Sequence, residues 1–381
     1  MDPILSLAQK KQKELITFLK ELVECESPSD DPASIERFVE LFTARTSDIT
    51  KAKVIKGRDG FGPHLQCEML LDGPKRRDGQ VLALGHSDTV YPLGTLAKMP
   101  FRQRDGSLYG PGVYDMKGGV AFFVYAMRIL RDLEIPVRRR VLLQLVSDEE
   151  VGSVTSRALT ESEARKSIAV LVLEPGQGLD GHAKTARKGI GDYTVTVHGR
   201  SAHAGVDPQA GASAVVELAR QIEVIAGFTN FEQGVTVNPG VVRGGTRSNV
   251  IADFAQAEVD IRVPNLRHFT ALDKKFRKLR AFDKRCRVEV EGGLNRPPME
   301  RTKGVVALYK QARSLAAKLG VDLQESATGG GSDGNFTAAL GVPTLDGLGA
   351  VGEGAHSPGE RVLVDRIADR VALLAHLVAA I

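Results

Sequence analysis

A histidine and an aspartate, His86 and Asp88, follow directly on an apolar run of strand length at 81–85 (VLALG). Residues two apart in an extended segment point to the same side. The Asp88 carboxylate can therefore hydrogen-bond one ring nitrogen of His86 while the other nitrogen binds a metal ion. Such a pair alone is more often structural than functional, but ligands of open α/β sheets gather at the carboxyl ends of strands, which favours function here.

Three more acidic sites stand at comparable places along the chain. Asp115 lies in a glycine-rich turn at 109–119 that opens a helical pattern, and the acidic run 148–150 and Glu174 each follow a further apolar run. Any one of these acids is most simply a helix cap or a first-turn acid, but three of them at successive strand ends, beside a His-x-Asp pair, make coincidence improbable. The turn lacks the G-x-x-x-x-G-K-[ST] pattern of a phosphate loop, which favours a cation.

Carboxylate and imidazole ligands of this kind suit zinc, with cobalt or manganese as possible substitutes. Two such ions, about 3.5–4 Å apart and sharing a bridging carboxylate and a water, form a site for hydrolytic attack on an amide carbonyl. One acid has to stay unligated to act as general base. Glu149 and Glu150 can divide these tasks, because neighbours in extended chain point opposite ways.

The elements that must position these residues indicate an α/β domain. Apolar runs at 81–85, 141–146 and 168–173 do not alternate, as expected for strands buried on both faces. Between the first two, apolar residues trace one face of a predicted helix at 119–133. Strand, helix, strand in this order predicts a largely parallel sheet.

The pattern changes near residue 187. Segments 193–197 and 255–262 alternate strictly, as in strands with one face in solvent. With helices predicted at 210–226 and about 269–280, this stretch resembles a βαββαβ sandwich inserted in the larger domain. The α/β pattern then returns, so the larger domain is discontinuous. Its second part is predicted to hold a helix at 305–319, a strand near 321–325 and a helix at about 366–379.

A basic stretch at 267–287 holds nine Lys or Arg and two Asp. Phe269, Leu272, Phe276 and Leu279 recur within it at helical spacing. We therefore interpret the charges as the solvated face of an amphipathic helix and not as a nucleic-acid site.

Length and composition exclude other classes of protein. The 381 residues predict about two to three domains. A net charge of 51 − 47 = +4 does not demand a nucleic acid or an acidic membrane as partner. No stretch approaches about 18 uncharged apolar residues, and the N-terminus reads as an amphipathic helix, not a signal peptide. Cys25, Cys67 and Cys286 suggest neither disulfides nor a thiolate zinc site, so a reducing, cytoplasmic location is expected.

Eight motifs along the chain can be compared with known families. They are GHSDTVYPLGTLAKMPF at 85–101, LYGPGVYDMKGG at 108–119, SDEEVGS at 147–153, LEP at 173–175, GRSAHAG at 199–205, SNVI at 248–251, GGGSDGNF at 329–336 and GAHSPGE at 354–360. These motifs resemble the M20 family of co-catalytic zinc metallopeptidases, most closely its glutamate carboxypeptidase (carboxypeptidase G type) branch. The resemblance runs from about Leu15 to Leu377 with all motifs in the family's order. It implies a zinc-peptidase-like, three-layer catalytic domain at 1–186 and 298–381, and an inserted α+β sandwich lid at 187–297 through which two chains dimerise.

The resemblance also implies a role for each site residue. Asp88 would orient His86, and Glu149 would be the base that activates a water bridging the two ions. The peptide bond after the bridging aspartate would be cis. The implied metal ligands are His86 and Glu174 for one zinc ion, Glu150 and His356 for the other, and Asp115 as the bridge.

Four further residues would complete the site. His203 would reach into the partner subunit's site to stabilise the tetrahedral oxyanion. Asn249 and Arg262 match positions that hold the substrate's free carboxylate, which suits a guanidinium fork, although Arg262 alone is as readily a surface charge. The backbone at 329–331, around Gly330, would add amide donors.

One departure from the family concerns specificity. Glutamate-specific relatives place a lysine in the segment that enters the lid, to meet the substrate's side-chain carboxylate. By residue count that place is held here by His182, with Lys184 two residues on. A preference for C-terminal glutamate is therefore not implied.

The expected function is hydrolysis of the amide of an N-acyl or N-aminoacyl amino acid, or a peptide, with a free C-terminal carboxylate. The enzyme would be a homodimer with two Zn²⁺ per subunit and would have neither nucleic acid nor membrane as partner. An N-acyl-amino-acid deacylase or a dipeptidase on the same site is the alternative. A non-catalytic metal-binding protein is a remote one, because every site position of the family, Glu149 included, is present.

Overall fold

The computed structural model of the chain describes residues 2–73 and 78–381. It divides into two compact units. The first unit comprises the chain up to Ala186 together with Arg301–Ala327 and Ser332–Ile381. The second comprises Arg187–Glu300 and the short return Thr328–Gly331. It extends three residues beyond the expected end at 297, and the return carries no periodicity from which a sequence could assign it.

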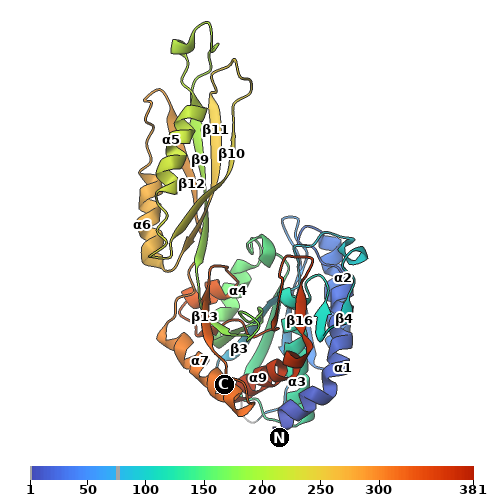
Figure 1. Cartoon of the computed structure of the whole chain (residues 1–381). Coiled ribbons are helices and arrows are strands. Elements are labelled where there is room, and N and C mark those ends of the chain that lie inside the picture. Colours follow the sequence, from blue (N-terminus) through green and yellow to red (C-terminus); the bar gives the residue numbers. More distant parts are fainter. Residues whose placement is uncertain (1, 74–77) are drawn as a thin grey trace. The chain divides into compact units, whose positions relative to one another are not determined.

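The first unit is built on a mostly parallel sheet in the order β1-β2-β6-β3-β7-β14 (Figure 1). β3 runs parallel to β6 and β7, and β14 runs parallel to β7, while β1 and β2 are antiparallel to their neighbours. The predicted α/β class is confirmed, and β3 lies between the strands that come after it in sequence. The bounds are β1 Thr50–Ile55, β2 His64–Met69, β3 Gln80–His86, β6 Arg140–Val146, β7 Ser167–Val172 and β14 Thr344–Leu345.

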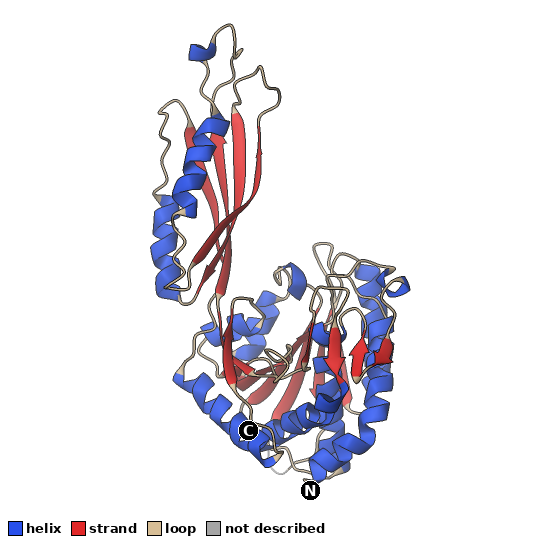
Figure 2. Cartoon of the chain, viewed as in Figure 1, coloured by secondary structure: helices blue, strands red, loops and turns tan. Residues whose placement is uncertain are grey.

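Helices cover both faces of this sheet and make three layers (Figure 2). Val81 and Ala83 of β3 pack into the large core on one face, and Leu82 and Leu84 pack into a smaller core on the other. Burial on both faces explains why the strand does not alternate in sequence. The large core takes in α1 Pro3–Glu24, α2 Pro32–Thr46, α3 Gly118–Asp132, α7 Lys303–Lys318 and α9 Ile367–Ala380, and the opposite face holds α4 Arg157–Ala164 and α8 Gly334–Ala339.

Two helix starts are explained by Asp-Pro pairs. Asp2 accepts a hydrogen bond from Leu5 N at 2.9 Å, and Asp31 accepts from Ala33 N at 3.1 Å. In each case proline fills the first helical position, where a missing N–H costs nothing. α1 is the amphipathic helix predicted for the N-terminus.

Short strands complete the first unit. A small sheet has the order β15-β16-β5-β4, and β8 pairs with β13. The strand predicted near 321–325 is wrong, because β13 begins only at Glu325. Val321 instead closes the C-terminus of α7, donating its N–H to Ala316 O at 3.0 Å after Gly320 at φ 79°. The bounds are β4 Arg102–Arg104, β5 Ser107–Tyr109, β8 Ala183–Arg187, β13 Glu325–Thr328, β15 Gly352–Glu353 and β16 Arg361–Leu363.

The second unit has the predicted βαββαβ order. Its antiparallel sheet runs β10-β11-β9-β12, with α5 and α6 on one face (Figure 1). The Tyr193 and Phe276 rings stack in its core with centroids 3.9 Å apart. α5 starts later than expected, because Pro208 opens a separate 3-10 turn and Ser213 caps the helix. The bounds are β9 Gly189–His198, α5 Ala214–Ala226, β10 Thr236–Gly244, β11 Phe254–Val263, α6 Leu266–Arg277 and β12 Arg287–Arg296.

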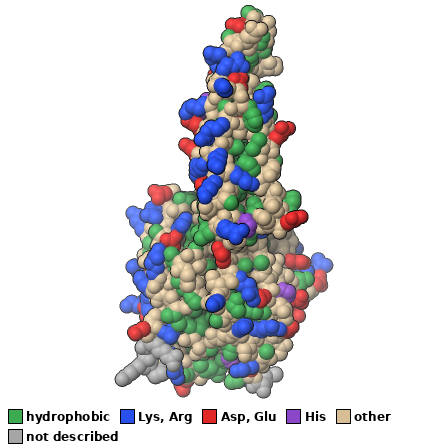
Figure 3. Space-filling view, turned by 90° about the vertical axis from the view of Figure 1, so that its left-hand side faces the viewer, with side chains coloured by type: hydrophobic (Ala, Val, Ile, Leu, Met, Phe, Trp, Pro, Cys, Tyr) green, Lys and Arg blue, Asp and Glu red, His purple; other side chains and the backbone are tan. Residues whose placement is uncertain are grey.

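The basic stretch forms the amphipathic helix α6 and the turn after it. α6 buries Leu272 and Phe276, and Lys and Arg side chains gather on this side of the second unit (Figure 3). Part of the charge serves the fold, because Arg277 donates to the carbonyls of Val290 and Gly292 at 2.9 and 2.6 Å.

Within the described ranges, no helix is both long and apolar enough to cross a membrane. Cys25, Cys67 and Cys286 are free thiols in this structure. The cytoplasmic location stays a prediction.

Candidate metal centre

The acidic and histidine residues singled out in the first unit meet at one edge of its parallel sheet. His86 is the last residue of β3, the run 148–150 comes after β6, and Glu174 comes after β7. Because β3 pairs in parallel with both β6 and β7, the three carboxyl ends lie side by side.

Asp115 stands between two imidazoles. Its Oδ1 lies 3.3 Å from His86 Nε2, and its Oδ2 lies 3.4 Å from His356 Nε2. Glu174 Oε1 is 3.7 Å from His86 Nε2, and Glu150 Oε2 is 3.3 Å from His356 Nε2. Two donors on one tetrahedral zinc ion, each about 2.0–2.2 Å from it, lie roughly 3.3–3.6 Å apart. Three of the four separations fall in this range and the fourth, at 3.7 Å, lies just above it, so the arrangement suits two ion positions that share Asp115.

An unsatisfied oxygen supports the same assignment. Glu150 Oε1 is buried and has no hydrogen-bond partner among the described residues. A buried carboxylate oxygen without a partner is costly, and a cation removes that cost. Glu150 and His356 therefore fit one divalent ion, and His86 with Glu174 fits the other.

The negative potential of the cluster shows in its pKa values. Hydrogen bonds to Asp115 and Glu150 raise the pKa of His356 to about 10. Burial alone would lower the pKa of His86, but its hydrogen bond to Asp115 and the charge of Asp88 raise it well above the usual value. Burial would raise the pKa of Asp115, yet the two imidazoles hold it far below its ordinary range. Carboxylates that hold protons on two imidazoles this firmly also hold divalent cations.

Asp115 lies in the short turn η2 Val113–Lys117, directly before α3. The peptide bond Asp115–Met116 is cis, as the family resemblance implies. Gly112, at φ 71°, has no room for a side chain, because a methyl group there would come within 2.7 Å of Thr89 Cγ2.

Asp88 contacts His86 through its main chain, whereas the sequence predicts a contact through its carboxylate. His86 Nδ1 is 2.8 Å from the main-chain carbonyl of Asp88 and 3.6 Å from the carboxylate Oδ1. The carboxylate accepts from Ser29 Oγ at 2.8 Å and from Glu150 N at 3.2 Å. Burial raises the pKa of Asp88 to about 6. Asp88 therefore orients His86 mainly through its backbone, while its side chain holds the acidic loop.

Glu149 and Glu150 do not lie in extended chain, so that premise is wrong. They form the 3-10 turn η3 Glu149–Val151, which Gly152 ends at φ 95°. Their side chains still diverge. Glu150 faces His356, whereas a Glu149 oxygen lies within 4.8 Å of ligand atoms of His86 and Glu174.

Buried polar groups anchor this acidic loop. Asp148 accepts from the backbone N–H and hydroxyl of both Thr155 and Ser156, at 2.5–3.2 Å. His64 of β2 accepts from Ser147 N at Nδ1, 3.2 Å away, and its Nε2 lies 3.0 Å from Thr155 Oγ1. Since Thr155 Oγ1 donates to Asp148, His64 Nε2 carries the proton. Nothing in the sequence marks His64, which lies more than 80 residues before its partners.

The predicted residues of the second unit fall into two groups. Arg262 pairs across the sheet with Ile190, which pairs with Arg296, and a methyl group at Gly331 would come within 2.6 Å of Ile190 Cδ1. Arg262 and the glycine run around Gly330 thus lie at one end of the sheet. His203 and Asn249 lie in loops beyond the other end of β9 and β11, joined by the bond from Ala204 N to Asn249 O at 3.0 Å. Ten-residue strands separate the two ends by about 30 Å.

His203 is exposed, and its tautomer is set by its own turn. Nδ1 accepts from Gly205 N at 3.1 Å and from Val206 N at 3.2 Å, so the proton lies on Nε2. Arg262 donates to both carboxylate oxygens of Asp260 at 2.9 and 2.8 Å. Two nitrogens of the Arg262 guanidinium therefore already bind the Asp260 carboxylate.

Two buried arginines near Gly330 carry no distinguishing signal in the sequence. Arg187 and Arg296 are each 4% exposed, and Arg187 Nη1 donates to the carbonyls of Gly330 and Gly331 at 3.2 and 2.9 Å. Sequence alone does not separate them from surface charges.

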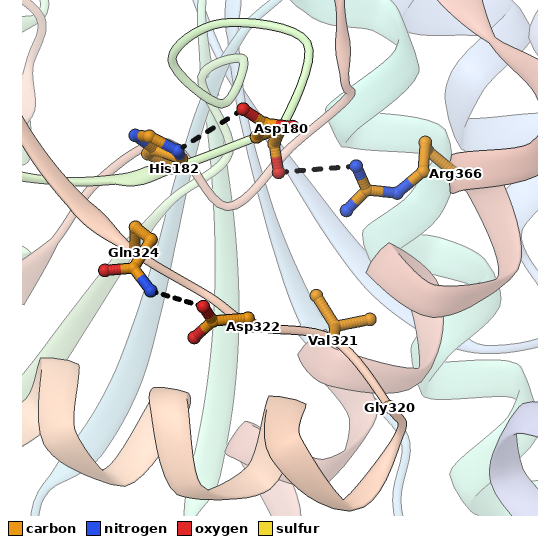
Figure 4. A pocket seen from close by; sticks show the side chains of 7 residues that line it. All are labelled: Asp180, His182, Gly320, Val321, Asp322, Gln324 and Arg366. Carbon is orange, nitrogen blue, oxygen red and sulfur yellow. Dashed lines mark hydrogen bonds and ion pairs between the residues drawn. The ribbon is translucent and has the colours of Figure 1, made fainter.

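His182 lies in a pocket of about 430 Å³ (Figure 4). Its Nε2 is 3.9 Å from Asp180 Oδ2, and the described residues that line the pocket include none of the expected metal ligands. Lys184 is buried, and its backbone pairs with that of Asp346. The lining residues are Asp180, His182, Gly320, Val321, Asp322, Gln324 and Arg366.

The sequence and the fold are similar to those of known proteins. Residues 82–380 match the model of peptidase family M20/M25/M40. Carboxypeptidase G2 of Pseudomonas sp. (strain RS-16) is 32% identical over 316 residues, which cover 80% of this chain and 74% of that protein. A succinyl-diaminopimelate desuccinylase of Cereibacter sphaeroides is 31% identical over 309 residues, covering 74% and 78%. The crystal structure of aminopeptidase PepT from Bacillus cereus superposes with a TM-score of 0.80 at 25% identity, covering 97% and 98%.

The His64 anchor predicts a loss of stability in acid. Burial holds the pKa of His64 below its ordinary 6.5, so the folded state prefers the neutral ring. The stabilisation is complete above pH 6.5 and is lost as pH falls through the lower, folded-state pKa, by up to about 1.4 kcal/mol per pH unit. Denaturant unfolding at pH 7 and pH 5.5, with a chelator present, should show a smaller loss of unfolding free energy for His64→Asn than for wild type. Equal losses would contradict this role.

Proposed function

The chain belongs to peptidase family M20/M25/M40 and is a metal-dependent hydrolase of that family, and from this premise we propose that it is a dizinc carboxypeptidase-like enzyme. Its substrate is an N-acyl or N-aminoacyl amino acid, or a small peptide, with a free C-terminal carboxylate, and the bond cleaved is the amide to that last residue. The observation that carries the proposal is Asp115, each of whose oxygens faces a different imidazole at 3.3 and 3.4 Å.

Glu149 is the proposed general base. Bound zinc supplies Lewis acidity and a water of lowered pKa. Glu149 lies beside His86 and Glu174, while its neighbour Glu150 faces His356, and this place next to the centre supports Glu149 as the acid that takes the water's proton. The same carboxyl group then returns a proton to the leaving nitrogen, because one acid–base group can serve both steps.

His203 is the proposed oxyanion donor. Its Nδ1 is held by two backbone N–H groups, so its exposed Nε2–H is free to donate to a developing oxyanion.

The spacing within the second unit favours a contribution from a second subunit. His203 and Asn249 lie about 30 Å along the strands from Arg262 and Gly330. One small substrate does not span that length. If all four residues serve one substrate, the two groups have to come from different chains, as expected for a homodimer with two-fold symmetry.

The second unit offers a surface for such a dimer. β10 is an edge strand, and its Val241 and Val242 are 40% and 56% exposed. Val215 and Val216 at the start of α5 are 42% and 53% exposed. An uncovered edge strand with apolar side chains suits pairing with a second copy.

Arg262 and the Gly330 backbone are the proposed carboxylate-binding groups. Arg262 uses Nε and Nη2 on Asp260, and a guanidinium carries five N–H donors. Nη1 is the nitrogen proposed to meet the substrate's carboxylate.

A deacylase acting on the same centre is the second candidate. The similarity to a protein named as a desuccinylase favours it, because the acyl group and not the amino acid would then decide specificity. Dipeptidase activity would use the same centre with a different pocket.

The Glu149→Gln variant should separate metal binding from catalysis. We expect about two zinc-type ions per chain in both wild type and the variant, with turnover about 10²- to 10⁴-fold lower in the variant. Elemental analysis and a steady-state assay measure the two quantities. Glu150→Gln is the matched control and should lose metal. A wild-type protein that binds no metal would refute the mechanism.

Mixing two inactive variants tests the second-subunit contribution. In a mixed dimer of His203→Ala and Glu149→Gln chains, one site keeps its own Glu149 and receives an intact histidine from the other chain. Coexpression or refolding together should restore about a quarter of wild-type activity, since half the dimers are mixed and each has one complete site. If His203 acts within its own chain, the mixture stays inactive.

A substrate panel tests the proposed specificity. Acyl-amino acids with a free carboxylate should be cleaved, and their C-terminal amides should react at least about 100-fold more slowly, because the guanidinium then loses its ionic partner. Varying the last residue with the acyl group fixed, and then the acyl group with the residue fixed, distinguishes carboxypeptidase from deacylase. Equal rates for acids and amides would contradict the carboxylate site.

A further inference from the structure

Glu360 is a buried carboxylate to which neither the proposed metal centre nor the proposed catalytic step assigns a role. Its side chain is fully buried and accepts four hydrogen bonds. Oε1 accepts from Tyr114 N at 2.8 Å and from Asp115 N at 2.9 Å. Oε2 accepts from Gly112 N at 3.0 Å and from the Tyr91 hydroxyl at 2.6 Å. Three of these donors are backbone N–H groups of the turn that presents the bridging Asp115.

The same segment also presents His356. Glu360 N donates to Ser357 O at 3.1 Å, and Ser357 N donates to Gly354 O at 3.0 Å, so residues 354–360 form two tight successive turns. His356 itself has a φ of 60°, a left-handed conformation that a histidine adopts only when its surroundings impose it. Gly354 is pressed against the far end of this loop, where a methyl group would come within 3.0 Å of Glu360 Cα.

Glu360 therefore connects two loops that lie about 240 residues apart in sequence. One loop carries Asp115 and the other carries His356, whose facing atoms are 3.4 Å apart. Tyr91 adds a second link, because its hydroxyl lies 3.0 Å from Ser357 O as well as next to Glu360. β16, which follows Glu360 directly, pairs with β5, which precedes the Asp115 turn, so the two loops are also joined by this short pair of strands.

We propose that Glu360 is a positioning residue of the metal centre, which holds Asp115 and His356 at the separation at which both bind one ion. The inference rests on the metal centre of the proposed function. Glu360 touches neither the ion nor the substrate, and acts through the backbone of the Asp115 turn and through its own loop.

The hydrogen-bond pattern makes glutamine a sharp test. Both carboxylate oxygens accept from backbone N–H groups, whereas a carboxamide has a single acceptor oxygen. Whichever way the amide of Glu360→Gln is turned, its NH₂ group faces at least one backbone N–H. The Asp115 turn then has to move away from the His356 loop.

Zinc titration of the purified, chelator-treated protein measures the expected effect. Competition against a chromophoric chelator should show about 10- to 100-fold weaker binding of the ion at His356 in Glu360→Gln, as for loss of a group that orients metal ligands. The circular dichroism of the variant should match that of wild type.

Glu217→Gln is the matched control. Glu217 is also buried and accepts from two backbone N–H groups, Phe282 N at 2.9 Å and Asp283 N at 3.0 Å, but it belongs to the second unit. Its amide variant should lose stability without any change in zinc affinity. If Glu217→Gln weakens zinc binding as much as Glu360→Gln does, the effect is general destabilisation and the inference is wrong.

If the Glu360→Gln variant does not fold, the Tyr91→Phe variant provides the test in its place. It removes one of the four donors and leaves the backbone donors in place, so zinc affinity should fall in the same direction by a smaller factor. Unchanged affinity in whichever of the two variants folds overturns the inference alone. Failure of the wild-type protein to bind zinc overturns the proposed function, and the inference with it.

Discussion

The structure depends on holding an excess of negative charge in a small, largely buried volume. Asp88, Asp115, Glu149, Glu150 and Glu174 converge at the carboxyl edge of the parallel sheet, where two imidazoles are the opposing side chains. Mutual repulsion and loss of hydration both oppose such a cluster. Divalent cations would balance this charge, and without them the cluster favours protonated imidazoles, in keeping with the raised pKa of His356. The sheet, the turns and the anchors around them keep these groups together in spite of their repulsion.

Carboxylates that accept hydrogen bonds from backbone N–H groups keep the ligand-bearing loops in place. Asp88 accepts a hydrogen bond from a backbone N–H of the acidic turn, and Asp148 accepts one from the segment after that turn. Glu360 accepts one from the turn that carries Asp115. Each anchor is itself an acid with its charge directed at local N–H dipoles, so it fixes a ligand-bearing loop without supplying a cation that would compete with the metal. His64 does the same for Ser147 as a neutral ring.

Features that short-range rules govern could be predicted from the sequence. The non-alternating strands, the helix at 119–133 and the inserted βαββαβ unit were accessible through periodicity, and the run 148–150 and Glu174 through their place after buried strands. Asp115 was accessible through its glycine-rich turn before a helix, because the strand ahead of it, β5, belongs to the small separate sheet. His203 and His356 came only through family motifs, because neither lies at a strand end. The roles of Glu360 and His64 could not be predicted, since their side-chain partners lie between about 80 and 270 residues away. Two expectations were wrong in detail. Glu149 lies in a 3-10 turn and not in extended chain, and His86 bonds to the main-chain carbonyl of Asp88 and not to its carboxylate. Contacts with other parts of the chain determine both features.

One measurement tests the central claim most directly: anomalous diffraction at the zinc absorption edge from crystals of the zinc-loaded protein. The account predicts two peaks per chain, about 3.5–4 Å apart, each adjacent to a different oxygen of Asp115, with His86 and Glu174 on one and Glu150 and His356 on the other. A single peak, or two peaks that do not share Asp115, would contradict it.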